Sequence, residues 1–139
     1  MSHIIETLSP TKGNRILIPV VIKNPNTNKC LAVKDALIDT GATQSIISID
    51  IAKALGISFA KAGETETAAG NVKSYLLKNI IMTFNSDIPV EFELDVQSLE
   101  TIKKGHVVIG MDILKQGKIC IERKLINGLD FLHMVFLVG

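Results

Sequence analysis

Apolar and polar residues alternate along much of the chain, and this alternation predicts β-strands. Between Ile88 and Val96 every second residue is apolar, and the residues between them are proline or acidic. Successive side chains of a strand point to opposite faces, so the apolar set would face a core and the acidic set would face water. The pattern therefore predicts a sheet with one buried face.

Turn-forming residues divide the remaining apolar runs into hairpins. Strands are expected at residues 15–22, 30–38, 75–84, 88–96, 107–109, 118–126 and 129–138. The sequence Asn127-Gly128 is the strongest short hairpin signal, and Gly70-Asn71 marks the tip of an exposed hairpin over residues 63–74. Pro19 indicates an edge strand or a bulge.

Two short helices are expected, each ending at a glycine. The first would cover residues 49–55 with Ser48 as its N-cap, and the second would cover residues 111–116. About eight strands with two short helices describe a small closed β-fold.

Composition supports a β-rich core in one domain. The chain has 139 residues, of which 47% are hydrophobic and only 4% aromatic, with no tryptophan. The core must be built from Ile, Leu and Val, which suits strands. This length fits a single domain, residues 1–139, in which we expect residues 1–14 to be a flexible N-terminal segment.

Charge and cysteine content narrow the range of partners. A net charge of +1 gives no electrostatic reason to expect nucleic acid or a membrane. The most apolar run, residues 131–138, is far shorter than the roughly 20 residues of a membrane-spanning helix. Cys30 and Cys120 are too few for a disulfide framework, so we expect buried, reduced thiols in a cytoplasmic protein. The histidines lack partners at metal-ligand spacing, and no metal is expected.

The most informative segment is residues 36–46, where a carboxylate stands between two apolar stretches. Asp39-Thr40-Gly41-Ala42 follows directly after the apolar residues that end at Ile38. A carboxylate beside buried segments is costly unless a function or a hydrogen bond uses it. Asp39 can therefore be catalytic, or it can form an Asx turn at the end of a strand.

A second motif, later in the chain, makes the interpretation of the Asp39-Thr40-Gly41 triplet more specific. The apolar run Val107–Ile109 ends at Gly110 and leads into the second expected helix. With both elements in this order, the chain resembles the retropepsin-like aspartic proteases, over about residues 15–121 and most specifically at residues 36–43 and 107–114.

The resemblance implies a fold and an activity. The fold would be all-β: a small closed β-barrel of the acid-protease (retropepsin) type with one or two short helices, active as a homodimer. The activity would be that of an aspartic endopeptidase, a hydrolase that acts on a peptide or protein substrate and needs no cofactor.

The resemblance also assigns roles to residues. Asp39 would be catalytic, and because the chain holds one such motif, the second carboxylate would come from Asp39 of a second copy. One carboxylate would deprotonate a water and the other would protonate the carbonyl oxygen. Thr40 would hydrogen-bond across the two-fold axis, and Gly41 would let the substrate backbone come close. Gly110 would support the active-site loop by letting residues 107–109 pass close beneath it.

The remaining roles concern substrate and dimer. The substrate-binding residues would be Gly41, Ala42, Thr43, Ala68, Ala69 and Gly70. The last three would form the tip of a flap that closes over the substrate. The C-terminal strand at residues 131–138 would supply the intersubunit sheet.

Two features depart from the retroviral pattern. Retroviral members pair an acidic residue after the triad with a basic residue after the late glycine, whereas this chain has Thr43-Gln44 and Met111-Asp112 at those places. The flap tip also carries a single glycine. These departures leave open a non-catalytic dimer of the same fold that binds peptides or a protein partner, and, third, a stand-alone barrel.

Overall fold

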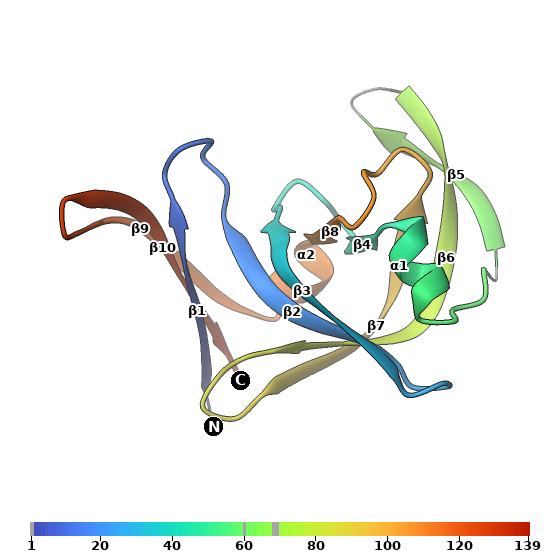
Figure 1. The fold of residues 1–139 in the computed structure, drawn as a ribbon, viewed down its shortest axis with the longest axis horizontal. Helices are drawn as coiled ribbons and strands as arrows, with labels where there is room; N and C mark the ends of the chain where they lie inside the picture. The colour runs from blue at the N-terminus through green and yellow to red at the C-terminus, as the bar shows by residue number, and fades with distance from the viewer. Residues whose placement is uncertain (1, 60, 68–69) are drawn as a thin grey trace.

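The computed structural model describes residues 2–59, 61–67 and 70–139. In this part of the chain it shows ten strands and two short helices (Figure 1). The strands are β1 (His3–Pro10), β2 (Leu17–Asn24), β3 (Lys29–Ile38), β4 (Ile46–Ile47), β5 (Lys61–Thr67), β6 (Gly70–Phe84), β7 (Val90–Leu99), β8 (Val107–Ile109), β9 (Gly117–Ile126) and β10 (Leu129–Val138). The helices are α1 (Ile49–Ala54) and α2 (Met111–Leu114). Neither has the length or apolar character of a membrane-spanning helix, among the residues described.

Six of the strands close into a barrel. Their order is β2-β3-β8-β4-β7-β6, and β6 pairs back with β2 at Ile22↔Met82 and its neighbours. Strand β5 adds to β6 outside this ring, as one arm of a hairpin that projects from the barrel in Figure 1. The expected all-β fold with a closed barrel and two short helices is confirmed.

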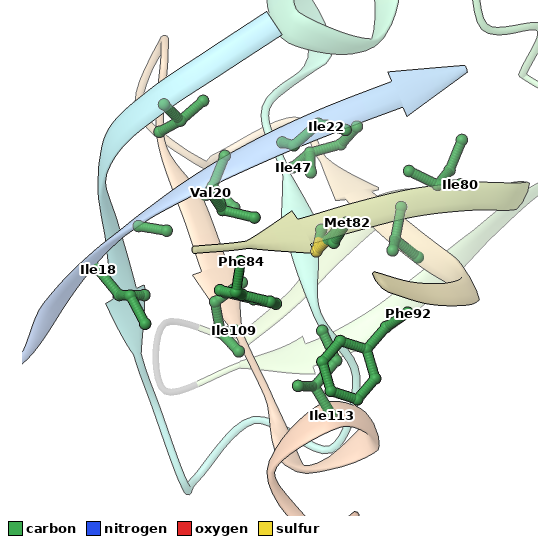
Figure 2. Close-up of a cluster of buried hydrophobic side chains, with 14 of the residues drawn as sticks. Ile18, Val20, Ile22, Ile47, Ile80, Met82, Phe84, Phe92, Ile109 and Ile113 are labelled. Atoms are coloured by element: carbon green, nitrogen blue, oxygen red, sulfur yellow. The ribbon is translucent and has the colours of Figure 1, made fainter. Parts of the chain in front are cut away.

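The barrel encloses a core of mainly aliphatic side chains. Figure 2 shows side chains from β2, β6, β8 and α2 converging on one cluster. Ile22, Ile80 and Met82 are fully buried, and Phe84 packs edge-on against Phe92 with 5.8 Å between ring centroids. Aliphatic side chains thus fill the barrel, as the scarcity of aromatic residues required.

The hairpins follow the turn chemistry of the sequence closely. Asn127 and Gly128 both have positive φ, at 52° and 76°, which a two-residue type I′ turn requires. The β2–β3 register shifts between Ile18 and Val20, so Pro19 lies at a bulge, where its missing N–H does no harm. Strand β7 buries Val90, Phe92 and Val96 as the alternation predicts.

Three expectations about exposure are wrong. Ile88 precedes β7 and is 55% exposed, so the buried alternation begins only at Val90. Cys30 and Cys120 are free thiols as expected, but both are exposed. Their strands carry mostly outward-facing side chains at these positions, and the thiols do not contribute to the core.

The N-terminal segment differs most from the expectation. Residues 3–10, expected to be flexible, form β1. The whole length of β1 pairs with residues 131–138 of β10, in a separate sheet of order β1-β10-β9. Ile5 is 1% exposed, and Thr7 Oγ1 donates to the carbonyl of Leu17 at 2.7 Å. The pairing His3↔Val138 also brings the ends of β1 and β10 together, as Figure 1 shows. An apolar anchor and a complete strand partner therefore order this segment.

Replacing Ile5 by Ala should lower the free energy of unfolding by about 2–4 kcal/mol, because it removes a buried side chain from the core. Ile4→Ala is the matched control on the same strand, where the side chain is 50% exposed, and it should cost less than about 1 kcal/mol. Urea unfolding followed by circular dichroism measures both. Equal small losses for the two variants would mean that β1 does not stabilise the fold.

Candidate active site

The loop that carries Asp39 connects β3 to β4, and these two strands lie on either side of β8. Strand β3 ends at Ile38 and pairs in parallel with β8, while β4 begins at Ile46 and pairs antiparallel with the same strand. Val108 is thus the register partner of both Leu37 and Ile46. Residues 39–45 have to arch over the end of β8, which fixes where Asp39 lies.

Hydrogen bonds hold the first half of this loop. The N–H of Asp39 donates to the carbonyl of Ile109 at 3.0 Å, and the N–H of Ala42 donates to the carbonyl of Asp39 at 3.2 Å. The N–H of Gly41 donates to Asp39 Oδ1 at 2.9 Å, which forms an Asx turn. Within the described residues Oδ2 has no hydrogen-bond partner. The turn therefore aims the carboxylate and leaves one oxygen available for chemistry.

Glycine is required at two positions around the loop. A Cβ on Gly110 would lie 2.8 Å from the carbonyl oxygens of Ala42 and Gln44, closer than real Cβ contacts come. The absence of that Cβ lets the N–H of Met111 donate to the carbonyl of Ala42 at 2.8 Å. A Cβ on Gly41 would lie 3.1 Å from Asp39 Oδ1 and would press on the carboxylate.

A hydrogen-bonded brace between Ser45 and Asp112 holds the second half of the loop. The N–H of Ser45 donates to Asp112 Oδ2 at 2.8 Å, and its hydroxyl donates to Asp112 Oδ1 at 2.7 Å. The N–H of Gly110 in turn donates to Ser45 Oγ at 3.0 Å. Ser45 is fully buried, so these bonds satisfy groups that water cannot reach.

Sequence reasoning missed this brace. The sequence showed only that no ion pair is possible between residues 43–44 and 111–112. A signal was present: Ser45 directly precedes the apolar Ile46, and Asp112 lies in the first turn of α2. A polar side chain so close to a buried strand needs a partner.

The other expected site residues fall into two groups. Thr40, Gly41 and Thr43 are exposed on the Asp39 loop, and Ala42 is partly buried. Of the flap residues, Gly70 is exposed with a φ of 107° and opens β6, while Ala68 and Ala69 lie outside the described residues. The backbone register Thr67↔Gly70 establishes that β5 and β6 form a hairpin.

The largest of three cavities lined by described residues does not include Asp39. The molecule has a cavity of about 530 Å³ against β2, β3 and α1, but Asp39 is not among its lining residues. Within the described residues no group of three or more His, Cys, Asp or Glu side chains is placed to hold a metal ion. The chemistry that the loop presents is that of a single half-buried carboxylate, Asp39.

A family model matches the part of the chain that contains the Asp39 loop and the strands beside it. Residues 32–116 match the family model described as "gag-polyprotein putative aspartyl protease". The chain belongs to this aspartyl protease family. The matched region runs from β3 through α2 and so contains the Asp39 loop, the hairpin of β5 and β6, and Gly110. A comparison with curated protein sequences found no match.

Solved structures show the same fold. A retropepsin-like aspartic protease from Rickettsia conorii aligns with a TM-score of 0.51 at 16% identity, covering 100% of this chain and 97% of that one. EIAV protease, solved in complex with the inhibitor HBY-793, aligns with a TM-score of 0.52 at 18% identity, covering 77% of this chain and 91% of that one. At such identities the likeness establishes the retropepsin-like fold.

Asp112→Ala should lower the free energy of unfolding by about 1–3 kcal/mol, because it leaves two donors of the buried Ser45 without an acceptor. Asp112→Asn keeps one oxygen acceptor and adds a donor, so its loss should be clearly smaller. Chemical unfolding of both variants beside the native chain measures the difference. If the alanine and asparagine variants lose equal stability, charge rather than the hydrogen-bond geometry holds the loop.

Proposed function

We propose that this protein is an aspartic endopeptidase that works as a homodimer, with a water activated between the Asp39 carboxylates of two copies. The observation that carries the proposal is the Asp39 carboxylate itself. A fixed turn aims it, one of its oxygens has no partner within the described residues, and Thr40, Gly41 and Thr43 beside it are exposed. Membership of an aspartyl protease family supports the same chemistry.

The chemistry needs two carboxylates within reach of one water. One must be ionised to take a proton from the water, and the other must be protonated to donate to the scissile carbonyl. Two such groups cannot both ionise cheaply at close range, so they share one proton and titrate as a pair. Asp39 forms the only Asp-Thr-Gly in the sequence, and a two-fold axis is the simplest way to supply the second acid.

The geometry of the loop suits this role. Thr40 is exposed, and its hydroxyl has no hydrogen-bond partner in the described part of the chain, so it is available to the loop of the second copy. The backbone bonds to Ile109 and the brace at Ser45 fix the loop before substrate arrives. A carboxylate that is already fixed does not have to reorganise during the reaction. Such preorganisation is the main source of electrostatic catalysis.

The substrate would be an extended peptide. Gly41 allows a peptide backbone close to the carboxylate, and Ala42 and Thr43 border the same loop. The hairpin of β5 and β6 would close over the peptide as a flap and exclude water, with Gly70 near its tip. A cytoplasmic location is part of the proposal, and two free thiols in the chain support it.

Asp39→Asn should reduce peptide cleavage to background, since it removes both the base and the shared proton from the dyad. Asp87→Asn makes the same chemical change at an exposed position between β6 and β7 and should leave cleavage unchanged. A peptide-library digest read by mass spectrometry compares the three proteins. Sedimentation should show the same dimer for all of them.

Two outcomes of that digest would overturn the proposal. One is equal cleavage by the native chain and the Asp39→Asn variant. The other is no cleavage by the native chain anywhere between about pH 4 and pH 7, where a shared proton is expected. The second outcome, together with retained peptide binding, would favour the non-catalytic peptide-binding dimer.

The rate should fall as pH rises past the point at which the pair of Asp39 carboxylates loses its shared proton. Above that pH no general acid remains to protonate the carbonyl oxygen, whereas below it one acid and one base coexist. A pH profile of kcat/KM on any cleaved peptide tests this. A rate that still climbs at alkaline pH would contradict the mechanism.

A further inference from the structure

The cavity of about 530 Å³ against β2, β3 and α1 has no part in the proposed reaction, because Asp39 does not line it. Its volume falls within the roughly 300–1,000 Å³ of sites that hold small organic molecules. Four of its lining residues are apolar and at least half-buried, namely Val20, Leu31, Val33 and Ile51. The cavity therefore offers an apolar surface to a ligand of that size.

Three charged residues line the same cavity, and in the described part of the chain none of them forms an ion pair. Lys34 and Asp35 are exposed, while Asp50 is half-buried and accepts the N–H of Gly105 at 3.1 Å. Burial alone would raise the pKa of Asp50. Hydrogen bonds from Ser48 and Gly105 and the positive charge of the nearby lysine at position 104 outweigh burial and hold this pKa below its usual value. Asp50 is therefore an anion at neutral pH.

A bulge in β3 places two of these charges next to each other. The register of β2 against β3 shifts beside the cavity, so that Pro19 stands opposite both Lys34 and Asp35. In a regular strand successive side chains alternate between the two faces, but a bulge inserts one extra residue. Lys34 and Asp35 are accordingly both exposed, between the buried residues Val33 and Ala36. An ammonium and a carboxylate thus line the cavity from the same stretch of strand.

We propose that this cavity is a second binding site, which takes a short peptide with apolar side chains and free termini. An apolar side chain of the peptide lies against the apolar lining, its ammonium group faces Asp35 and Asp50, and its carboxylate faces Lys34. Charge selects this occupant. Two anions and one cation around an apolar surface match a zwitterion with an apolar body, whereas an anion would be repelled by both carboxylates and a hydrocarbon would leave all three charges unmatched.

The cavity also borders the elements that hold the Asp39 loop. Asp35 lies four residues before Asp39 on β3, roughly 13 Å along the strand, and Ile51 lies in α1, directly after β4. Gly105 precedes β8, the strand that pairs with both β3 and β4. A peptide in the cavity therefore contacts the segments on both sides of the loop. Its binding should change the surroundings of the loop backbone as well as those of the cavity.

Modified dipeptides test the chemistry of the occupant. The probe is leucyl-leucine, and isothermal titration calorimetry measures its affinity for the full chain. Acetylating its amino group or amidating its carboxyl group should each weaken binding about tenfold, because each change removes a charge-assisted hydrogen bond. Seryl-serine keeps both charges but lacks the apolar side chains, and it should not bind measurably. Equal affinities for all four peptides, or no binding of leucyl-leucine, would overturn the proposal.

Substitutions in the cavity test its position. Ala32 lines the cavity and is exposed, so Ala32→Phe fills the space without removing a buried group, and this variant should lose leucyl-leucine binding. Asp35→Asn should weaken binding about tenfold, because it removes one partner of the ammonium group. Glu93→Gln is the matched control, since it neutralises an exposed carboxylate on β7 that does not line the cavity, and it should bind like the native chain. Circular dichroism checks that each variant is folded.

Native affinity in a folded Ala32→Phe variant would place the peptide outside the cavity and refute the site. Equal affinities for Asp35→Asn and Glu93→Gln would refute the role of the Asp35 carboxylate. Both results are independent of proteolysis, because calorimetry measures binding alone.

Nuclear magnetic resonance tests the coupling to the loop. When leucyl-leucine binds, the methyl signals of Val33 and Ile51 should shift, and the backbone amide signals of Gly41 and Ala42 should shift at the same peptide concentrations. Neither set should shift in Ala32→Phe. Shifts at Val33 and Ile51 alone would refute the coupling, and shifts at Gly41 and Ala42 alone would show that the peptide binds at the Asp39 loop instead.

Failure of this inference can be told apart from failure of the proposed function. Asp39→Asn should abolish cleavage and keep the native affinity for leucyl-leucine, since Asp39 does not line the cavity. A native chain that cleaves library peptides but does not bind leucyl-leucine retains the function and refutes the second site. A chain that binds leucyl-leucine in the cavity but never cleaves retains the second site and refutes the protease.

Discussion

The close approach between the Asp39 loop and the start of α2 holds the candidate site together. The carbonyls of Ala42 and Gln44 lie where a side chain of residue 110 would be, and only a glycine leaves that space open. The same approach brings the N–H of Met111 to the Ala42 carbonyl and the N–H of Gly110 to Ser45. Position 110 thus couples the short strand β8 to the orientation of the carboxylate at position 39.

The hydrogen bonds between Ser45 and Asp112 hold the loop in place although the ion pair of the retroviral pattern is missing here. The resemblance noted in the sequence would place an ion pair near this point, whereas here a buried hydroxyl and a backbone N–H donate to one carboxylate. Hydrogen bonds to a charged acceptor are stronger than neutral ones, and no second charge has to be desolvated. The missing ion pair is therefore no reason to expect a loose loop.

The Asp39 loop and the sheet of β1, β10 and β9 each lack a partner in the described part of the chain. The Asp39 loop presents one acid where the proposed chemistry needs two, and among the described residues no strand pairs with the outer side of β9 in the sheet of β1, β10 and β9. The extra strands β1 and β10 do not close the sheet within the chain. They extend it, and β9 lies at its outer edge in the part of the chain that the structure describes.

The sequence by itself determined the hairpins, the longer barrel strands and the place of the acid, because alternation, turn residues and the Asp39-Thr40-Gly41 triplet are local signals. It could not reveal that residues 3–10 form a strand, since the partner of β1 lies at the other end of the chain. For the same reason Cys120 was expected to be buried, while the sheet order exposes it. The brace of Ser45 with Asp112 also joins residues far apart in sequence. Tertiary structure alone decided these contacts, because burial and pairing depend on which distant segments meet.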